Sequence, residues 1–274
     1  GFHRKEEVHT LAQDLEILPA FLCHRDDVVL MRQPPTQAHR EKLHHLGFEI
    51  PEFEALDSEG RIAPDSLLRT RKLNDLRPWA WGPQSTALLQ SLDPGGVAVR
   101  WTPAIRDLFA KDRQVEALGL ESTVCRTRDE VQAAALALQA DGFPEAVAKS
   151  PFGAAGQKNR KFPTAPPTAL QPWLDRVLAQ QGAIVVEPWL LKVFEFSVHY
   201  DFDGTTLDRL AYVQLINDRR GQFQACVAQT KFCRGVDPEI TRFLMGGAFD
   251  TYENEIPAKL QPLLQAANYR GPVG

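Results

Sequence analysis

Short apolar runs and helical spacings alternate along the first sixty residues of the chain. Residues 28–31, VVLM, form an apolar run of the length expected for a buried parallel strand. Residues 36–46 place apolar side chains at helical spacing, and Gly47 suits the end of that helix. Apolar residues then alternate over 48–53, which predicts a second strand. This order predicts a βαβ unit of the kind found in doubly wound sheets.

Residues 54–100 are less regular. The segment 77–83, RPWAWGP, is rigid and aromatic, and Ser85 is expected to cap the helix that follows it. The default role for Trp79 and Trp81 is packing.

The pattern becomes regular again after residue 103 and predicts alternating helices and strands. Thr127 with Glu130 three residues later matches a capping box, which predicts a helix over 128–140. Residues 151–161 are expected to form a loop and 163–172 a proline-rich connection. The remaining elements are expected as helices over 104–115, 173–181, 238–249 and 257–267, and strands over 145–149, 183–186, 193–202, 208–216 and 222–230.

Composition narrows the function classes. Of 274 residues, 43% are hydrophobic and 24% charged, as in an ordinary globular protein. The net charge of −4 supplies no broad positive field, which argues against nucleic-acid binding. No apolar run reaches a membrane span of about 18 residues, and no apolar signal core follows the charged N-terminus. The four cysteines are scattered, which favours reduced thiols in a cytoplasmic protein.

The strongest chemical feature is the segment 149–161, KSPFGAAGQKNRK, which follows an apolar strand. Lys149 would be a fixed charge at the strand end, and Gly153 and Gly156 would let backbone N–H groups approach phosphate oxygens. The segment is not a P-loop. A solvated surface loop has the same composition, so both interpretations stay open.

A second feature is the strand exit at 187–190, EPWL, followed by Glu195. Adenine binding needs an apolar slot with one backbone acceptor and one donor, which a strand exit can provide. Taken alone, the segment fits better as a β-hairpin whose acids point to solvent. Taken alone, Lys111 is typical of a lysine on the surface of a helix. Lys231 and Arg234 are typical of a solvated basic strand end.

In combination these features resemble the ATP-grasp superfamily. Lys111, Lys149, the 150–160 loop and Glu187-Pro188-Trp189-Leu190 follow one another in the family's order, and the resemblance covers roughly residues 20–274. It implies an α/β (α+β) fold with a pre-ATP-grasp-like domain over 1–100, a lid subdomain over 101–186 and a C-terminal subdomain over 187–274. Residues 269–274 resemble the strand that leads to the family's metal-binding acids, so we expect a truncated last subdomain.

The resemblance also implies roles. Lys111 and Lys149 would contact the α- and β-phosphates, and the backbone at Pro188 and Leu190 would read adenine beside Glu187. Glu195 would hold the ribose, and Lys231 and Arg234 would serve the γ-phosphate or a carboxylate substrate as catalytic residues. The remaining nucleotide-binding residues are expected to be Ser150, Gly153, Ala154, Ala155, Gly156 and Trp189.

The implied activity is an ATP-dependent ligase that joins a small carboxylate to an amine, or to a thiol, through an acylphosphate. ATP and Mg²⁺ would be its cofactors, with magnesium ligands unassigned and expected after Gly274. Dimers are common in the superfamily, so a homodimer is one expectation. Two alternatives stay open: a degenerate member that binds nucleotide without catalysis, and an unrelated α/β transferase whose basic loop binds another anion.

Overall fold

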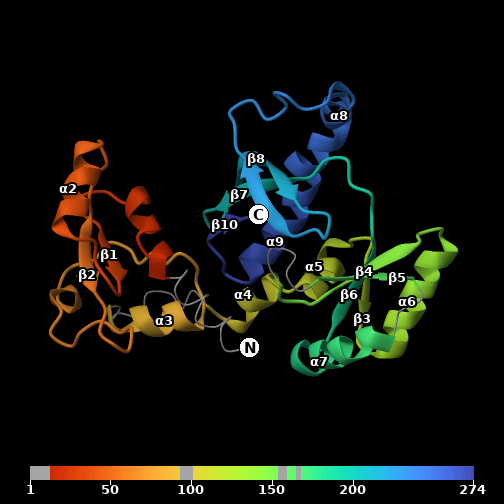
Figure 1. Ribbon diagram of the computed structural model, residues 1–274, viewed down its shortest axis with the longest axis horizontal. Coiled ribbons are helices and arrows are strands. Elements are labelled where there is room, and N and C mark those ends of the chain that lie inside the picture. The colour runs from red at the N-terminus through yellow and green to blue at the C-terminus, as the bar shows by residue number, and fades with distance from the viewer. Residues whose placement is uncertain (1–12, 93–100, 154–158, 165–167) are drawn as a thin grey trace. The chain divides into compact units, whose positions relative to one another are not determined.

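A computed structural model of the chain describes residues 13–92, 101–153, 159–164 and 168–274 (Figure 1). The chain divides into two compact units, Gly1–Trp101 and Thr102–Gly274. Both mix helices with strands, so the α/β (α+β) class expected from the sequence is confirmed. Within the described residues, every helix is too short or too polar to traverse a lipid bilayer.

The first unit is built around two parallel strands. β1 (Val28–Met31) pairs with β2 (Glu52–Ala55) in the register Val28↔Glu52, and α2 (Gln37–His45) connects them. Thr36 caps α2 by accepting a hydrogen bond from the backbone N–H of His39. The unit also contains η1 (Leu18–Leu22), η2 (Leu67–Arg69), α3 (Pro83–Leu89) and η3 (Gln90–Leu92), and its buried core is formed by Ile62, Leu68, Leu89 and Leu92.

Two expectations for this unit are wrong in detail. The second strand covers 52–55 rather than 48–53, because Pro51 has no N–H to donate to a ladder. Ser85 does not cap α3: Gly82 holds the cap position, and the Ser85 hydroxyl accepts from its N–H at 2.9 Å.

The second unit opens with three helices and an antiparallel sheet. The helices are α4 (Pro103–Leu108), α5 (Lys111–Leu118) and α6 (Arg128–Ala140). The first sheet has the order β3-β6-β4-β5, and its strands are β3 (Thr123–Cys125), β4 (Glu145–Lys149), β5 (Asn159–Pro163) and β6 (Ile184–Pro188). Helices α6 and α7 (Gln171–Gln181), the latter after η4 (Thr168–Leu170), pack on one face of this sheet over a core that includes Val131, Leu174 and Val186 (Figure 1).

The second sheet of this unit is also antiparallel, in the order β10-β7-β8-β9. Its strands are β7 (Phe196–Phe202), β8 (Leu207–Asn217), β9 (Phe223–Val227) and β10 (Gly271–Val273). Helix α9 (Ile256–Ala266) packs on it through Leu264, against Val198, Tyr200 and Phe202. A strand at 271–273 agrees with the strand entry expected there.

Several elements of the second unit differ from the expectation. The predicted loop 151–161 contains the start of β5, and the predicted helix 104–115 is two helices, which separate at Phe109 and Ala110. The predicted helix 238–249 is α8 (Pro238–Phe243) followed by π-helical turns at η5 (Leu244–Ala248) and η6 (Thr251–Glu255). Gly247, with φ 133°, breaks the helical path, since this conformation strongly favours glycine.

Candidate functional site

Lys149 and Glu187 lie side by side on one face of the first sheet. Lys149 is opposite Val185 in the ladder, and Glu187 is two residues further along β6, so both side chains point to the same face. The Lys149 ammonium donates a hydrogen bond to Glu187 Oε2, and each side chain is 26% exposed. The two segments that the sequence predicted to embrace one ligand therefore meet at this ion pair.

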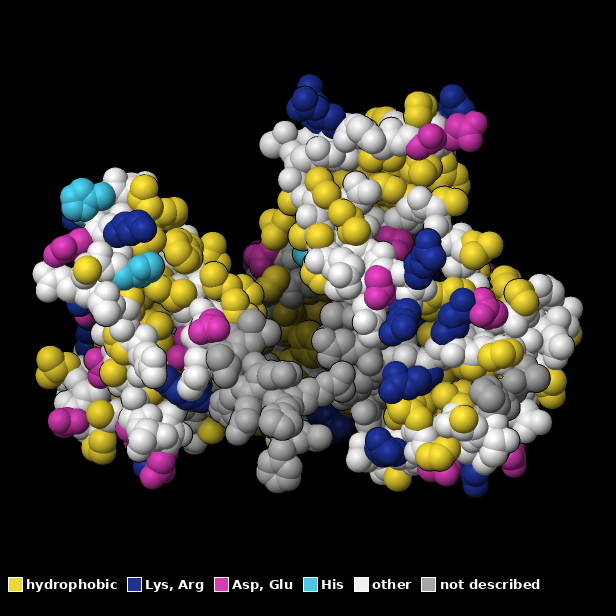
Figure 2. Space-filling model, viewed as in Figure 1, with side chains coloured by type: hydrophobic (Ala, Val, Ile, Leu, Met, Phe, Trp, Pro, Cys, Tyr) yellow, Lys and Arg dark blue, Asp and Glu magenta, His cyan; other side chains and the backbone are white. Residues whose placement is uncertain are grey.

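Further charges follow on the same face. Lys161 of β5 forms an ion pair with Glu145 of β4 at 2.7 Å, and its ammonium lies 4.9 Å from the centre of the Trp189 ring. Figure 2 shows Lys and Arg side chains gathered along the part of this unit that holds β4 and β6 in Figure 1. This face carries the charged side chains beside the buried Val147 and Val185, whereas the opposite face packs against α6 and α7.

Lys111 holds the segment that follows β4. Its backbone N–H donates to the carbonyl of Pro151 at 3.1 Å, and its ammonium donates to the carbonyl of Gly153 at 2.5 Å. Ser150 is 1% exposed and lies between Lys149 and these contacts. The helix lysine and the strand-end lysine are thus linked through one short stretch of backbone.

Gln181, the last residue of α7, was missed by sequence reasoning. Its side-chain oxygen accepts a hydrogen bond from the backbone N–H of Phe152 at 2.9 Å. Arg106 of α4 lies 4.9 Å from the centre of the Phe152 ring. No local pattern identifies a helix-end glutamine as the anchor of a segment 29 residues earlier. We call residues 150–153 the loop root; Ala154, Ala155 and Gly156 lie outside the described residues.

The strand exit after β6 leaves a backbone donor available. The N–H of Trp189 donates to the carbonyl of Glu145 at 2.9 Å, which continues the ladder past Pro188. The N–H of Leu190 makes no hydrogen bond to any residue that the structure describes, and the Leu190 side chain is 55% exposed. A backbone donor beside apolar surface is one half of the arrangement that an adenine edge needs, and the other half is a backbone acceptor.

Glu195 lies just before β7 and is not part of the Lys149–Glu187 pair. Its carboxylate accepts a hydrogen bond from the ammonium of Lys192, and its carbonyl accepts from the N–H of Leu215 at 2.9 Å. It is followed on alternate positions by Ser197 and His199, whose side chains are hydrogen-bonded at 2.9 Å.

Lys231 and Arg234 lie in a turn beyond β9, which ends at Val227. The two residues line a cavity of about 370 Å³ together with Gln229 and Thr230. The Gln229 amide donates to the carbonyls of Phe232 and Arg234 at 3.0 and 2.9 Å, which fixes the turn. Neither cation has an acidic partner among the described residues. We call residues 229–235 the basic turn.

The described residues of this unit show neither a metal-binding cluster nor an activated nucleophile. In the described part of the chain, no three His, Cys, Asp or Glu side chains are grouped so that they would hold a metal ion. Burial raises the pKa of the Cys125 thiol to about 11, which keeps it protonated and unreactive near neutral pH. Burial, followed by a hydrogen bond to Glu253, raises the pKa of Tyr212 to about 12.

No protein-family model and no curated protein matches the sequence. Among solved structures, the chain is similar to the biotin carboxylase domain of 2-oxoglutarate carboxylase from Hydrogenobacter thermophilus, in complex with MgADP, ADP and bicarbonate. The sequence identity is 12% and the TM-score is 0.43. The match covers 61% of this chain and 36% of the other chain.

Two further structures are similar to the chain. The first is the D-alanine-D-alanine ligase from Coxiella burnetii, with 12% sequence identity and a TM-score of 0.41; the match covers 68% of this chain and 48% of that chain. The second is N5-carboxyaminoimidazole synthetase from Staphylococcus aureus complexed with ADP, with 11% sequence identity and a TM-score of 0.43; the match covers 90% of this chain and 58% of that chain. All three are proteins of the ATP-grasp type, the family that the sequence resembles. The chain spans between about a third and three fifths of their length.

Proposed function

We propose that residues 102–274 bind ATP and form the nucleotide site of an ATP-dependent ligase that activates a carboxylate as an acylphosphate. The observation that carries the proposal is the Lys149–Glu187 ion pair next to the loop root that Lys111 holds. The two lysines lie at the end of β4, and the strand exit with its N–H lies further along β6, where Trp189 is opposite Glu145 at the start of β4.

The cations suit a polyphosphate. Lys111 and Lys149 would neutralise the α- and β-phosphates, because a point charge on a flexible stem can follow phosphate oxygens. The loop root already presents its backbone in a fixed position, since Lys111 and Gln181 hold it at Pro151, Phe152 and Gly153. The glycine-rich residues beyond it would cover the phosphates.

The strand exit suits a purine. The Leu190 N–H would donate to adenine and the Pro188 carbonyl would accept from it, with Glu187 near the exocyclic amine. Glu195 would accept hydrogen bonds from the ribose hydroxyls, after Lys192 moves away from its carboxylate.

When bound, ATP with Mg²⁺ would supply the γ-phosphoryl group that turns a carboxylate into an acylphosphate, which an amine or thiol attacks with release of phosphate. The chain would contribute positioning and charge rather than a side-chain nucleophile. The basic turn, whose two cations have no acidic partner among the described residues, would bind the γ-phosphate or the carboxylate substrate. No described residue is assigned to the magnesium ion.

The test is calorimetric titration of the whole chain with ATP, GTP and inorganic triphosphate, each with Mg²⁺. We expect ATP to bind more tightly than GTP, because the strand exit would read the adenine edge. Equal affinity for all three would refute adenine recognition, and no binding would refute the proposed site.

Catalysis is tested separately by trapping. With hydroxylamine present, an acylphosphate is converted to a hydroxamate, so a panel of carboxylic and amino acids is screened for hydroxamate and ADP formation. Binding of ATP without product on any acid of the panel would favour nucleotide binding without catalysis.

A further inference from the structure

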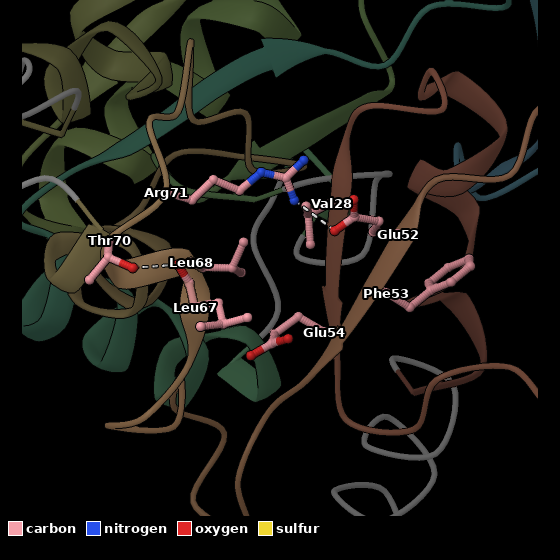
Figure 3. A pocket seen from close by; sticks show the side chains of 8 residues that line it. All are labelled: Val28, Glu52, Phe53, Glu54, Leu67, Leu68, Thr70 and Arg71. Atoms are coloured by element: carbon pink, nitrogen blue, oxygen red, sulfur yellow. Dashed lines mark hydrogen bonds and ion pairs between the residues drawn. The ribbon is translucent and has the colours of Figure 1, made fainter.

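The first unit contains a cavity of about 350 Å³ that the proposed nucleotide site does not use (Figure 3). It lies between the β1–β2 pair and residues 67–71, which include η2. Its apolar lining includes Val28, the buried Leu68 and the largely exposed Leu67. A volume of this size is at the lower end of cavities that bind small molecules.

The cavity borders two glutamates, the exposed Glu52 and the half-buried Glu54, on the strand face that carries Val28 and Leu30. Val28 is opposite Glu52 and Leu30 is opposite Glu54, so these four side chains share one face. Val28 and Leu30 pack against the core cluster that includes Leu68, whereas Figure 3 shows Phe53 directed away from Leu67 and Leu68. Strands of a parallel sheet ordinarily carry apolar residues at such positions. The glutamates leave polar, unfilled space there.

The charged groups that line the cavity do not balance among the described residues. Glu52 forms an ion pair with Arg71 at 2.6 Å, drawn as a dashed line in Figure 3. Glu54 is half-buried and has no hydrogen-bond or ion-pair partner among the described residues. Among the described residues, one half-buried carboxylate is therefore left without a cation beside the apolar side chains of Val28 and Leu68.

We propose that this cavity binds a small organic ammonium compound that carries a short apolar chain. The ammonium would donate hydrogen bonds to the Glu54 carboxylate, and the chain would contact Val28, Leu67 and Leu68. A metal ion is a poorer fit, because hard cations require six or more oxygen ligands, and no group of three potential metal ligands is found in the described residues. An anion is a poorer fit as well, because Glu52, Glu54 and Arg71 together give the cavity lining a net negative charge.

The first experiment uses the unmodified full chain and n-butylammonium chloride as the probe, followed by amide NMR. We expect saturable shifts at Glu54, Leu68 and Thr70, while sodium butyrate at the same ionic strength causes none. Equal shifts with butyrate, or shifts that rise linearly without saturation, would overturn the proposal.

A matched pair of variants tests the carboxylate. Glu54→Gln is expected to weaken butylammonium binding at least tenfold, whereas Glu41→Gln on α2, which makes the same change of charge away from the cavity, leaves it unchanged. Unchanged binding in Glu54→Gln would also overturn the proposal. Since the comparison of butylammonium with butyrate needs no variant, it decides the matter even if Glu54→Gln fails to fold. ATP titrations are independent of the outcome, because the proposed nucleotide site belongs to the other unit.

Discussion

The ammonium of Lys111 donates a hydrogen bond to the carbonyl of Gly153, which lies 42 residues further along the chain. This contact joins the start of α5 to the loop root, and the backbone N–H of Lys111 adds a bond to Pro151. Gln181 holds the same segment from α7. The backbone expected to approach phosphate is therefore positioned by two helices before any ligand binds, which reduces the entropy lost on binding.

Replacement of Gln181 by alanine tests this positioning. The variant leaves the half-buried N–H of Phe152 without its acceptor, so the free energy of unfolding is expected to fall by ~1 kcal/mol. ATP affinity is expected to fall about fivefold, equivalent to ~1 kcal/mol. Chemical denaturation and calorimetry measure the two effects. The adjacent, exposed Gln180 is the control, and an equal loss of affinity in Gln180→Ala would contradict a specific role for Gln181.

Lys149→Ala should have the largest effect on nucleotide binding. A hydrogen bond to a charged group contributes ~1.5–3 kcal/mol, so ATP affinity is expected to fall by at least about tenfold. Heat stabilisation by ATP should disappear with it, as followed by differential scanning fluorimetry. Lys42→Ala, an exposed lysine of α2, removes the same charge elsewhere and should change neither quantity. Full stabilisation of Lys149→Ala by ATP would remove the main support for the proposed site.

The basic turn is expected to distinguish ATP from ADP. In the double variant Lys231→Gln and Arg234→Gln, ATP affinity should fall by roughly tenfold, or ~1.4 kcal/mol, while ADP affinity is unchanged. The reason is that only ATP carries the γ-phosphate that these cations would contact. Thermal stability should change little, since neither cation has an acidic partner in the described part of the chain. An equal loss of affinity for ATP and ADP would indicate that the turn contacts the inner phosphates. Unchanged affinity for both would indicate that the turn contacts the carboxylate substrate instead.

The sequence predicted those helices and strands whose signals lie within their own residues. β1 at 28–31 and α6 at 128–140 were predicted with the observed bounds, from an apolar run and from a Thr127 cap. β5 was missed because it is an edge strand that exposes Arg160 and Lys161 and buries only Phe162. Its sequence pattern therefore resembles that of a charged loop. The edge position itself is not visible in the sequence.

The candidate site shows the same division. The order of Lys111, Lys149 and Glu187 was available from a family resemblance, but the pairing of Lys149 with Glu187 depends on the register of β4 against β6. The hydrogen bond from Phe152 to Gln181 depends on where α7 ends relative to the sheet. Such contacts are set by packing between segments distant in sequence, which no spacing rule contains.

Trp189 rests against the backbone of Gly221, and this contact provides a last test. Gly221 has a φ of 73° in the turn between β8 and β9, and a Cβ added there would lie 3.2 Å from Cη2 of Trp189. Gly182, with φ 77°, has no atom within 4 Å of an added Cβ. Both alanine variants carry the backbone penalty of ~1 kcal/mol for a positive φ, but only Gly221→Ala also displaces the indole.

We therefore expect Gly221→Ala to lower the free energy of unfolding more than Gly182→Ala, as measured by chemical denaturation. The indole N–H resonance of Trp189 should shift in Gly221→Ala alone, and ATP affinity should fall, since the displaced ring moves the backbone beside Leu190. Equal destabilisation in both variants with an unmoved Trp189 resonance would show that the strand exit tolerates the added methyl group. In that case, the backbone at 188–190 is held by the Trp189–Glu145 hydrogen bond rather than by the packing of the ring.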